Sequence, residues 1–272
     1  MDDFDAFLAE DLQKKGDITS DALFTTEQAQ ASIVSKETCV LAGIEEAMEV
    51  FKRVGEHPQP QAHDGDQITA NTEVMTIQGL AKNILKAERL ALNFLGRMSG
   101  IATQTHQLVS ICHDINPNVT VAATRKTTPG FRKYEKKAVV LGGGEAHRMG
   151  LFDAVMIKDN HLNCVESLEQ AITNVLTKNL RPIEVEVENK DDALRAAHFP
   201  IDVIMLDNFS PTEAQKVAQL IREKNNAILI EISGGITPKN IHLYASFADR
   251  ISLGFLTHSV KNKDFSLTLT PM

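Results

Sequence analysis

The chain has 272 residues, of which 43% are hydrophobic, and it carries a formal net charge of −8 at pH 7. This length and apolar content suffice for a large buried core, whereas the acidic balance argues against nucleic acid or an anionic membrane as a partner, because both require a basic surface. No apolar run approaches the ~20 residues of a membrane-spanning helix, the acidic start lacks a basic secretory region, and the three cysteines show no CxxC spacing, so we expect a cytoplasmic protein without a disulfide framework or zinc site.

The first ~80 residues mix helical and strand patterns. Residues 4–12 have apolar side chains at helical spacing and predict a short amphipathic helix. Residues 30–43 and 73–79 read as strands, and residues 44–55 between them as a helix. A long helical pattern then begins at Ala81 and runs through Gly100. No linker composition marks a boundary, so we expect the second domain to begin along this helix.

The second half alternates apolar runs of strand length with segments of helical period, which predicts a parallel sheet. The runs are VTVAA, DAVMI, IEVEV, VIML, ILIEI and RISLG. Each run ends in polar or glycine residues, as the strands of a β/α barrel do where they form an active site. Polar ends on successive strands favour a closed ring over an open doubly wound sheet, which stays the structural alternative.

A basic segment lies within this acidic chain. From Arg125 to Lys158 there are eight basic residues against three acidic ones. Arg125 and Lys126, beside Thr124 at a strand end, can bind a carboxylate or phosphate. The glycine run 142–144 permits a tight turn that delivers His147 and Arg148 close by, and Lys158 ends the next strand.

Cations that converge on one site repel one another unless an anion lies between them, so the set predicts a dianionic or polyanionic substrate. The alternative for Lys133, Lys136 and Lys137 is a solvated helix face, and for His147 a structural hydrogen bond.

Carboxylates follow two successive strands. Glu188 and Asp207 are expected to hold Mg²⁺, in part through water and a substrate diphosphate. Glu184, Glu186 and Glu188 alternate, so they point to one face, which in a barrel strand is the interior. The alternative for Glu184 and Glu186 is structural pairing with barrel lysines.

Glycines also follow the last strands. Ser233, Gly234 and Gly235 precede Thr237-Pro238, where we expect a helix to begin, and Gly254 ends the next strand. Paired loops after the last strands of a barrel commonly bind phosphate.

These motifs resemble those of the quinolinate phosphoribosyltransferase family. The matching stretches run from GDIT at 16–19 to the C-terminus and include TRKTTPGFR, KKAVVLGGGEAHRMGL, IKDNHL, VEVEN, IMLDN, SGGIT and LGFLTHS. The resemblance implies an α/β fold: an N-terminal open α/β sandwich domain (residues 1–102, rejoined by 259–272) followed by an incomplete, seven-stranded β/α barrel (residues 103–258).

The resemblance also implies the reaction: quinolinate and phosphoribosyl pyrophosphate give nicotinate mononucleotide, pyrophosphate and carbon dioxide, in de novo NAD biosynthesis. Arg125, Lys126, His147, Arg148 and Lys158 would surround the two quinolinate carboxylates, with Thr124 beside them. Glu188 and Asp207 would serve the ribose and the Mg²⁺-pyrophosphate, and the 5-phosphate would be bound by Ser233, Gly234, Gly235 and Gly254.

Lys126, Lys158, Glu188 and Asp207 are the residues that the resemblance implies as catalytic. It further implies a homodimer in which Arg89 reaches the partner's site, with assembly to a hexamer left open. EISGG in place of the commoner EASGG, and a short segment before Asp207, are departures that leave loop geometry in doubt.

Three alternatives remain open on the sequence. The first is a related phosphoribosyltransferase acting on nicotinate, or a paralogue linked to molybdenum metabolism. The second is a barrel lyase or aldolase with Lys158 as a Schiff-base nucleophile. The third is a binding protein without turnover.

Overall fold

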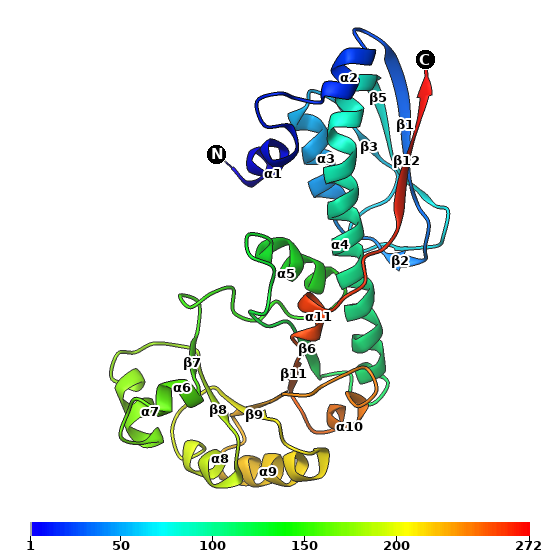
Figure 1. Ribbon diagram of the computed structural model, residues 1–272. Helices are drawn as coiled ribbons and strands as arrows, with labels where there is room; N and C mark the ends of the chain where they lie inside the picture. The colour runs from blue at the N-terminus through cyan, green and yellow to red at the C-terminus, as the bar shows by residue number, and fades with distance from the viewer. Residues whose placement is uncertain (1) are drawn as a thin grey trace. The chain divides into compact units, whose positions relative to one another are not determined.

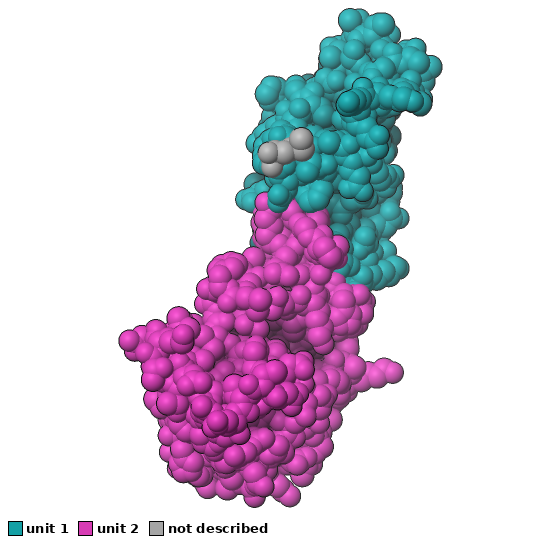
Figure 2. Space-filling model, turned by 60° about the vertical axis from the view of Figure 1, so that its left-hand side comes forward, with its two compact units in different colours: residues 1–104, 140–142, 260–272 teal, residues 105–139, 143–259 magenta. Residues whose placement is uncertain are grey.

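The computed structural model describes residues 2–272, which form two compact units. Unit 1 runs to Gln104 and includes Val140–Gly142 and Val260–Met272, and unit 2 consists of Thr105–Val139 and Gly143–Ser259 (Figure 2). No helix of the described residues is long and apolar enough to cross a membrane.

Unit 1 contains antiparallel sheets and the helices beside them (Figure 1). Its elements are α1 (Asp3–Leu12), α2 (Ile18–Leu23), β1 (Gln28–Ser35), β2 (Cys39–Val40), α3 (Ile44–Arg53), β3 (Gln59–Pro60), β4 (Gln67–Ile68), β5 (Glu73–Leu80), the first part of α4 (Ala81–His113) and β12 (Phe265–Pro271). Four strands form one sheet in the order β12-β1-β5-β3, and β2 pairs with β4. Alternate residues of β1 are buried, and Ile33 pairs with Met75 of β5 and Leu267 of β12. The C-terminal strand therefore completes the sheet of the N-terminal unit.

Two glycines of α4 let the chain that leads to β12 pass close to the helix. A Cβ on Gly100 would lie 2.5 Å from the carbonyl oxygen of Lys261, and one on Gly96 would lie 2.9 Å from that of Lys263. Glycine inside a helix destabilises the helix by about 1 kcal/mol relative to alanine. At these two positions, however, the absence of a Cβ is what leaves room for the neighbouring chain.

Unit 2 is the β/α unit. Its elements are β6 (Thr120–Ala122), α5 (Arg132–Leu141), β7 (Val155–Ile157), α6 (Asp159–Leu162), α7 (Leu168–Leu176), β8 (Ile183–Val187), α8 (Lys190–Ala196), β9 (Val203–Asp207), α9 (Pro211–Lys224), β10 (Leu229–Ser233), α10 (His242–Ala245), β11 (Arg250–Ser252) and α11 (Phe255–His258). All six strands predicted in the second half are present, and they form a parallel sheet in the order β6-β11-β10-β9-β8-β7.

The seventh strand of the expected barrel is reduced to a single contact. Glu145 forms one parallel bridge with Ala122 of β6, and no pairing joins this segment to β7 within residues 2–272. The ring is therefore open between Glu145 and β7, and the segment that crosses this opening carries His147 and Arg148.

Period-two alternation decides which side chains of β8 enter the ring. Ile183, Val185 and Val187 are buried under the outer helices, whereas Glu184 and Glu186 point to the other face. Helices α7, α8 and α9 lie side by side along the sheet (Figure 1). Each fully buried aliphatic side chain contributes roughly 1.5–3 kcal/mol to stability.

The outer helices begin directly after the loops at the carboxyl ends of the strands or close to them. The side chains of Ser167, Asn189 and Ser210 accept hydrogen bonds from backbone N–H groups three residues later, at the starts of α7, α8 and α9. These caps limit the loops after β8 and β9 to a few residues, so the polar groups at the strand ends are held close to the sheet.

Candidate active site

A cavity of about 780 Å³ lies at the carboxyl ends of the parallel strands. All but two of the predicted site residues line it: Thr124, Arg125, Lys126, His147, Arg148, Lys158, Asp207, Ser233, Gly234, Gly235 and Gly254. Parallel strands bring their carboxyl ends to the same edge of a sheet, which is why residues far apart in the sequence meet here.

Five cationic or potentially cationic side chains line this cavity. They are Arg125, Lys126, His147, Arg148 and Lys158. Arg148 is oriented by hydrogen bonds from its guanidinium to the Ala154 carbonyl (3.1 Å) and to the Met156 sulfur (3.3 Å). Burial lowers the pKa of Arg148, and the charge of Arg125 lowers it further. This mutual repulsion is the signature of a site prepared for an anion.

A buried lysine supports the loop that carries two of these cations. The ammonium of Lys136 donates to the carbonyl of Ala146 and, at 2.7 Å, to that of Arg148. Burial lowers the pKa of Lys136 to about 8, and the charge of Arg132 acts in the same direction. Lys136 is 1% exposed, so it is not the solvated helix-face charge that the sequence left open.

The glycine run before this loop is required by close packing. A Cβ on Gly144 would lie 2.8 Å from the Val121 carbonyl oxygen and 2.9 Å from Val139 Cγ1. The chain can therefore turn back against β6 only with glycine at this position, and the turn brings His147 to the cavity with φ of 53°.

His147 meets two carboxylates beneath the cavity. Its Nε2 lies 3.2 Å from Oε2 of Glu184 and 3.3 Å from Oε2 of Glu231. Burial alone lowers the pKa of His147, but the nearby carboxylates of Glu184 and Glu231 raise it to about 9. Arg250 Nη1 lies 3.0 Å from the same Glu231 oxygen.

The acidic residues separate into two environments. Asp207 ends β9 and lines the cavity, and Asn208 Nδ2 donates to its Oδ2 at 2.6 Å. Glu186 also lines the cavity and forms an ion pair with Lys158. Glu188 lies one residue beyond β8, is exposed and does not line the cavity.

Glycines follow two of the strands whose carboxyl ends line the cavity. Gly234 and Gly235 follow β10 with φ of 83° and 62°, a conformation that favours glycine, and Gly254 follows β11. A Cβ on Gly254 would lie 2.7 Å from Lys126 Cδ. Small residues here leave backbone N–H groups accessible to a phosphate.

The helix expected at Thr237-Pro238 is absent. Residues 238–241 form a turn instead, and α10 begins only at His242. Asn240 Oδ1 accepts from the backbone N–H of Thr237 at 2.7 Å and the Ile241 N–H donates to the Thr237 carbonyl at 3.0 Å, as at a helix start, but the next N–H groups, of Leu243 and Tyr244, bond to carbonyls only three residues back. A phosphate site at this loop would therefore depend on the glycine backbone rather than on a helix N-terminus.

Several residues that line the cavity were not predicted from the sequence, notably Glu231 and His258. A signal for Glu231 exists, because it is the one charge inside the apolar run ILIEI and shares a strand face with Ser233. His258 lies four residues after Gly254, at the end of the one-turn helix α11. Helical spacing therefore places its ring beside Gly254.

Arg89 belongs to unit 1 and does not line the cavity. It is exposed on α4 and has no hydrogen-bond or ion-pair partner in the described part of this chain.

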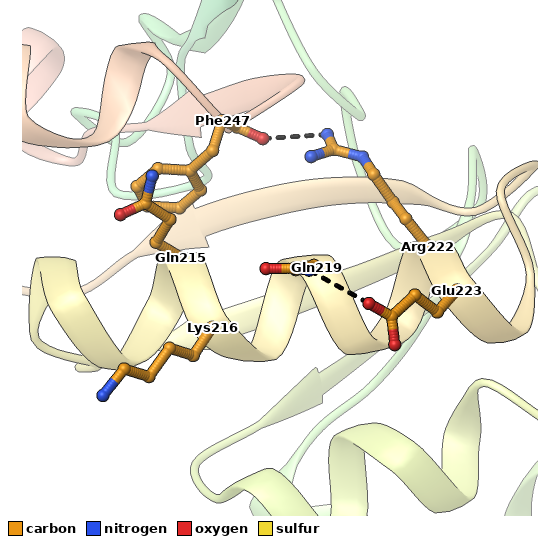
Figure 3. Close-up of a pocket in the computed structure, with 6 residues that line it drawn as sticks. All are labelled: Gln215, Lys216, Gln219, Arg222, Glu223 and Phe247. Carbon is orange, nitrogen blue, oxygen red and sulfur yellow. Dashed lines mark hydrogen bonds between the residues drawn. The ribbon is translucent and has the colours of Figure 1, made fainter.

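A second hollow, of about 560 Å³, lies on α9 and is lined by Gln215, Lys216, Gln219, Arg222, Glu223 and Phe247 (Figure 3). Gln219 and Arg222 already bond to Glu223 and to the Phe247 carbonyl, and the exposed side chains do not converge on one point (Figure 3). The strand-end cavity is therefore the candidate active site.

Known proteins resemble this chain over nearly its whole length. Residues 17–99 match the model of the quinolinate phosphoribosyl transferase N-terminal domain, and residues 101–268 match that of the C-terminal domain. A probable nicotinate-nucleotide pyrophosphorylase (carboxylating) from Archaeoglobus fulgidus is 44% identical over 93% of this chain and 97% of its own length. The nicotinate-nucleotide pyrophosphorylase (carboxylating) of Rattus norvegicus is 37% identical over 89% and 82%. The crystal structure of NadC from Streptococcus pyogenes superposes with a TM-score of 0.92 at 38% identity, over 99% of this chain and 95% of that one.

Proposed function

This chain belongs to the quinolinate phosphoribosyltransferase family, and from that premise we propose how its cavity joins quinolinate to phosphoribosyl pyrophosphate to make nicotinate mononucleotide for NAD biosynthesis. The observation that carries the proposal is that one cavity is lined both by five cationic or potentially cationic side chains, which we call its cationic part, and by the glycines that follow β10 and β11, which we call its glycine-rich part. The first suits an aromatic dicarboxylate and the second a sugar phosphate.

The cationic part accounts for the acid substrate. Arg125 and Arg148 present planar guanidinium groups that bind carboxylates through two parallel hydrogen bonds, while Lys126 and Lys158 act as point charges. A dicarboxylate offsets this charge better than a monocarboxylate does. We therefore propose that quinolinate, rather than nicotinate, is the preferred substrate.

The glycine-rich part accounts for the ribosyl donor. Ser233, Gly234, Gly235 and Gly254 would bind the 5-phosphate, and Asp207 would accept hydrogen bonds from the ribose hydroxyls. With both substrates held in reacting geometry, positioning and charge supply most of the rate enhancement.

Mg²⁺ belongs to this proposal, and the oxygen donors at the cavity fit it. Mg²⁺ keeps several waters and binds through one or two carboxylates together with substrate phosphates. Asp207, which lines the cavity, would hold it together with the substrate phosphates, and Glu188, which lies outside the cavity, would take part only through water. When bound, Mg²⁺ neutralises charge on the departing pyrophosphate.

The reaction has two bond-breaking steps. The ring nitrogen of quinolinate attacks the anomeric carbon, the bond from that carbon to pyrophosphate breaks, and pyrophosphate leaves with the electron pair. The bond from ring C2 to its carboxylate then breaks, carbon dioxide leaves, and C2 takes up a proton. Lys126 and Lys158 are the cationic acids that we assign to this second step.

The test is turnover of the purified protein with phosphoribosyl pyrophosphate, Mg²⁺ and either quinolinate or nicotinate. We expect quinolinate to yield mononucleotide and carbon dioxide in equal amounts, and chelation of Mg²⁺ to stop both. Turnover of nicotinate alone would assign the chain to the monocarboxylate reaction. Borohydride trapping with a carbonyl substrate would label Lys158 only if the Schiff-base alternative held.

We propose further that the active form is a homodimer in which Arg89 enters the partner's cavity. Its exposure in unit 1 without an intrachain partner supports this. Exposed Leu151 (75%) and Phe152 (88%) supply apolar surface that a partner could cover. Sedimentation would distinguish a dimer from a hexamer. We also propose a cytoplasmic location, with which three cysteines in the thiol form agree.

Arg89→Ala is expected to be inactive alone but to regain activity when mixed with Arg148→Ala. Each heterodimer then contains one cavity with both arginines, so random mixing restores about a quarter of wild-type activity. The measurement is activity after subunit exchange. Lys82→Ala, two turns earlier on α4, should stay fully active. Full activity of Arg89→Ala alone would contradict the shared site.

A further inference from the structure

His147 lies between two buried carboxylates that approach the same ring nitrogen. The exposed fractions of the His147, Glu184 and Glu231 side chains are 8%, 7% and 0%. Oε2 of each glutamate is within 3.3 Å of Nε2. Neither oxygen is aligned for a hydrogen bond with Nε2, so the contact is an ion pair, and two carboxylates at this distance favour a protonated, charged ring.

This contact fixes what the other ring nitrogen can do. With Nε2 protonated, the neutral ring would present a lone pair at Nδ1, and the imidazolium would present an N–H donor. Among the described residues Nδ1 has no hydrogen-bond partner, and His147 lines the cavity. The charge of the ring therefore decides whether Nδ1 attracts or repels a carboxylate placed there.

The charges around the ring favour the imidazolium. Glu184 faces it from β8 and Glu231 from β10, while Arg250 of β11 lies 3.0 Å from Glu231 and also pairs with Glu145. Arg125 and Arg148 line the same cavity, and Glu186 there is paired with Lys158. With a neutral His147, Glu184 would be a buried carboxylate without a cation, which is costly.

We propose that Glu184 and Glu231 are positioning residues that keep His147 doubly protonated, so that its Nδ1–H donates to a carboxylate of the bound substrate. The identity of that carboxylate as one of quinolinate's rests on the proposed function. The protonation of the ring in the free protein does not.

The two glutamates are not equivalent. Burial raises the pKa of Glu231, but the neighbouring His147 and the charge of Arg250 lower it below its ordinary value. Burial raises the pKa of Glu184 above its ordinary value. Glu231 contacts Arg250 as well as His147, so its loss would also leave the Arg250 charge close to the ring without this partner, and it should have the larger effect on His147.

The same three groups are close enough to hold a divalent cation, since their ligand atoms lie within 4.8 Å of one another. The guanidinium of Arg250, which lies beside the Glu231 oxygen that faces His147, already supplies positive charge there. We therefore propose a protonated His147 rather than a bound divalent cation at this place. Binding of a metal here is one of the outcomes that the test distinguishes.

The test is an NMR titration of the histidine rings in the substrate-free, chelator-treated protein, with the His147 signal assigned by its loss in His147→Gln. We expect wild-type His147 to titrate near pH 9. Glu184→Gln should lower that midpoint by about one unit, and Glu231→Gln by more. Glu145→Gln is the matched control, because it removes a carboxylate from Arg250 without touching His147. Unchanged midpoints in both variants, or a stoichiometric metal bound at this site, would overturn the proposal.

A second measurement tests the functional part. The KM for quinolinate should rise steeply above pH 9 in the wild-type enzyme, and the rise should begin more than about one pH unit lower in Glu231→Gln. In a His147→Gln background, Glu231→Gln should add little, because both changes remove one interaction. If Glu231 had a purely structural role, Glu231→Gln would raise the KM equally at every pH, and that result would contradict the proposal. If quinolinate is not turned over at all, the proposed function fails while the titration remains decisive.

Stability provides a readout that does not need activity. The pKa of His147 is about 9 in the folded protein and ~6.5 when unfolded. Its stabilising contribution is therefore complete below about pH 6.5 and is lost as pH rises toward 9. Lys136, whose folded pKa is about 8, is charged in both the folded and the unfolded protein below that pH. Above it the folded protein loses this proton first, so Lys136 makes stability rise with pH only there. Between pH 6.5 and 8 the wild-type protein should lose stability faster than Glu231→Gln, and equal slopes would contradict the inference.

Discussion

Arg148→Ala is expected to lower kcat/KM for quinolinate by about 10²–10³-fold, with the KM for phosphoribosyl pyrophosphate changed only a few-fold. Removing one partner of a desolvated charge pair costs roughly 2–5 kcal/mol, and tenfold in rate corresponds to about 1.4 kcal/mol. The guanidinium is already oriented by Ala154 and Met156, so little of its binding energy is lost in ordering it. Steady-state kinetics with each substrate varied in turn makes the measurement.

The control for this prediction is another arginine of unit 2 outside the cavity. Arg195 is 51% exposed and pairs with Asp192 and Glu169 on the outer helices. Arg195→Ala should leave the kinetics unchanged, because exposed ion pairs contribute little. Arg148→Lys should recover only part of the loss, since an ammonium cannot form the paired hydrogen bonds of a guanidinium. A selective rise in the KM for the ribosyl donor would show that Arg148 has been assigned to the wrong substrate.

Gly234→Ala is expected to raise the KM for phosphoribosyl pyrophosphate by about 100-fold and to leave quinolinate binding intact. Positive φ alone costs alanine about 1–2 kcal/mol. The added Cβ would also lie 2.2 Å from Asn208 Oδ1 and 2.6 Å from the Asn208 backbone nitrogen. That nitrogen donates to the Ser233 carbonyl at 3.0 Å, so the backbone cannot retreat without breaking a sheet-edge bond.

Gly235→Ala separates the effect of the steric clash with Asn208 from the effect of backbone strain at positive φ. Gly235 also has positive φ, but a Cβ there meets nothing within 4 Å. We therefore expect less than about a tenfold rise in the same KM. Titration calorimetry with quinolinate checks that each variant is folded. Equal losses in the two variants would mean that contact with Asn208 is not what preserves the phosphate loop.

Local signals predicted most of unit 2. Strand-length apolar runs and period-two alternation located six strands and placed Glu184 and Glu186 inside the ring, because both depend on backbone geometry that neighbouring residues impose. The strand-end cations were predicted to meet because parallel strands share an edge. They do line one cavity, while the roles assigned to them remain proposals.

Local signals were incomplete at two places. The Thr237-Pro238 pattern is typical of a helix start and Asn240 caps Thr237 as such a start requires, yet a turn forms over residues 238–241 and the helix α10 begins only at His242. Lys136 fits a solvated helix face equally well by pattern, and only the packing of α5 against the His147 loop shows that it is buried.

The sequence by itself determined the alternation of strands and helices, the strands and the residues that end them, because each of these features depends on the pattern of a few neighbouring residues. The tertiary structure alone decided that the ring stays open beside Glu145, that Glu188 lies outside the cavity and that His147 is placed between Glu184 and Glu231. Those outcomes depend on distances between segments remote in sequence. The charge state of a buried group likewise depends on which other charges the fold brings within a few ångströms of it.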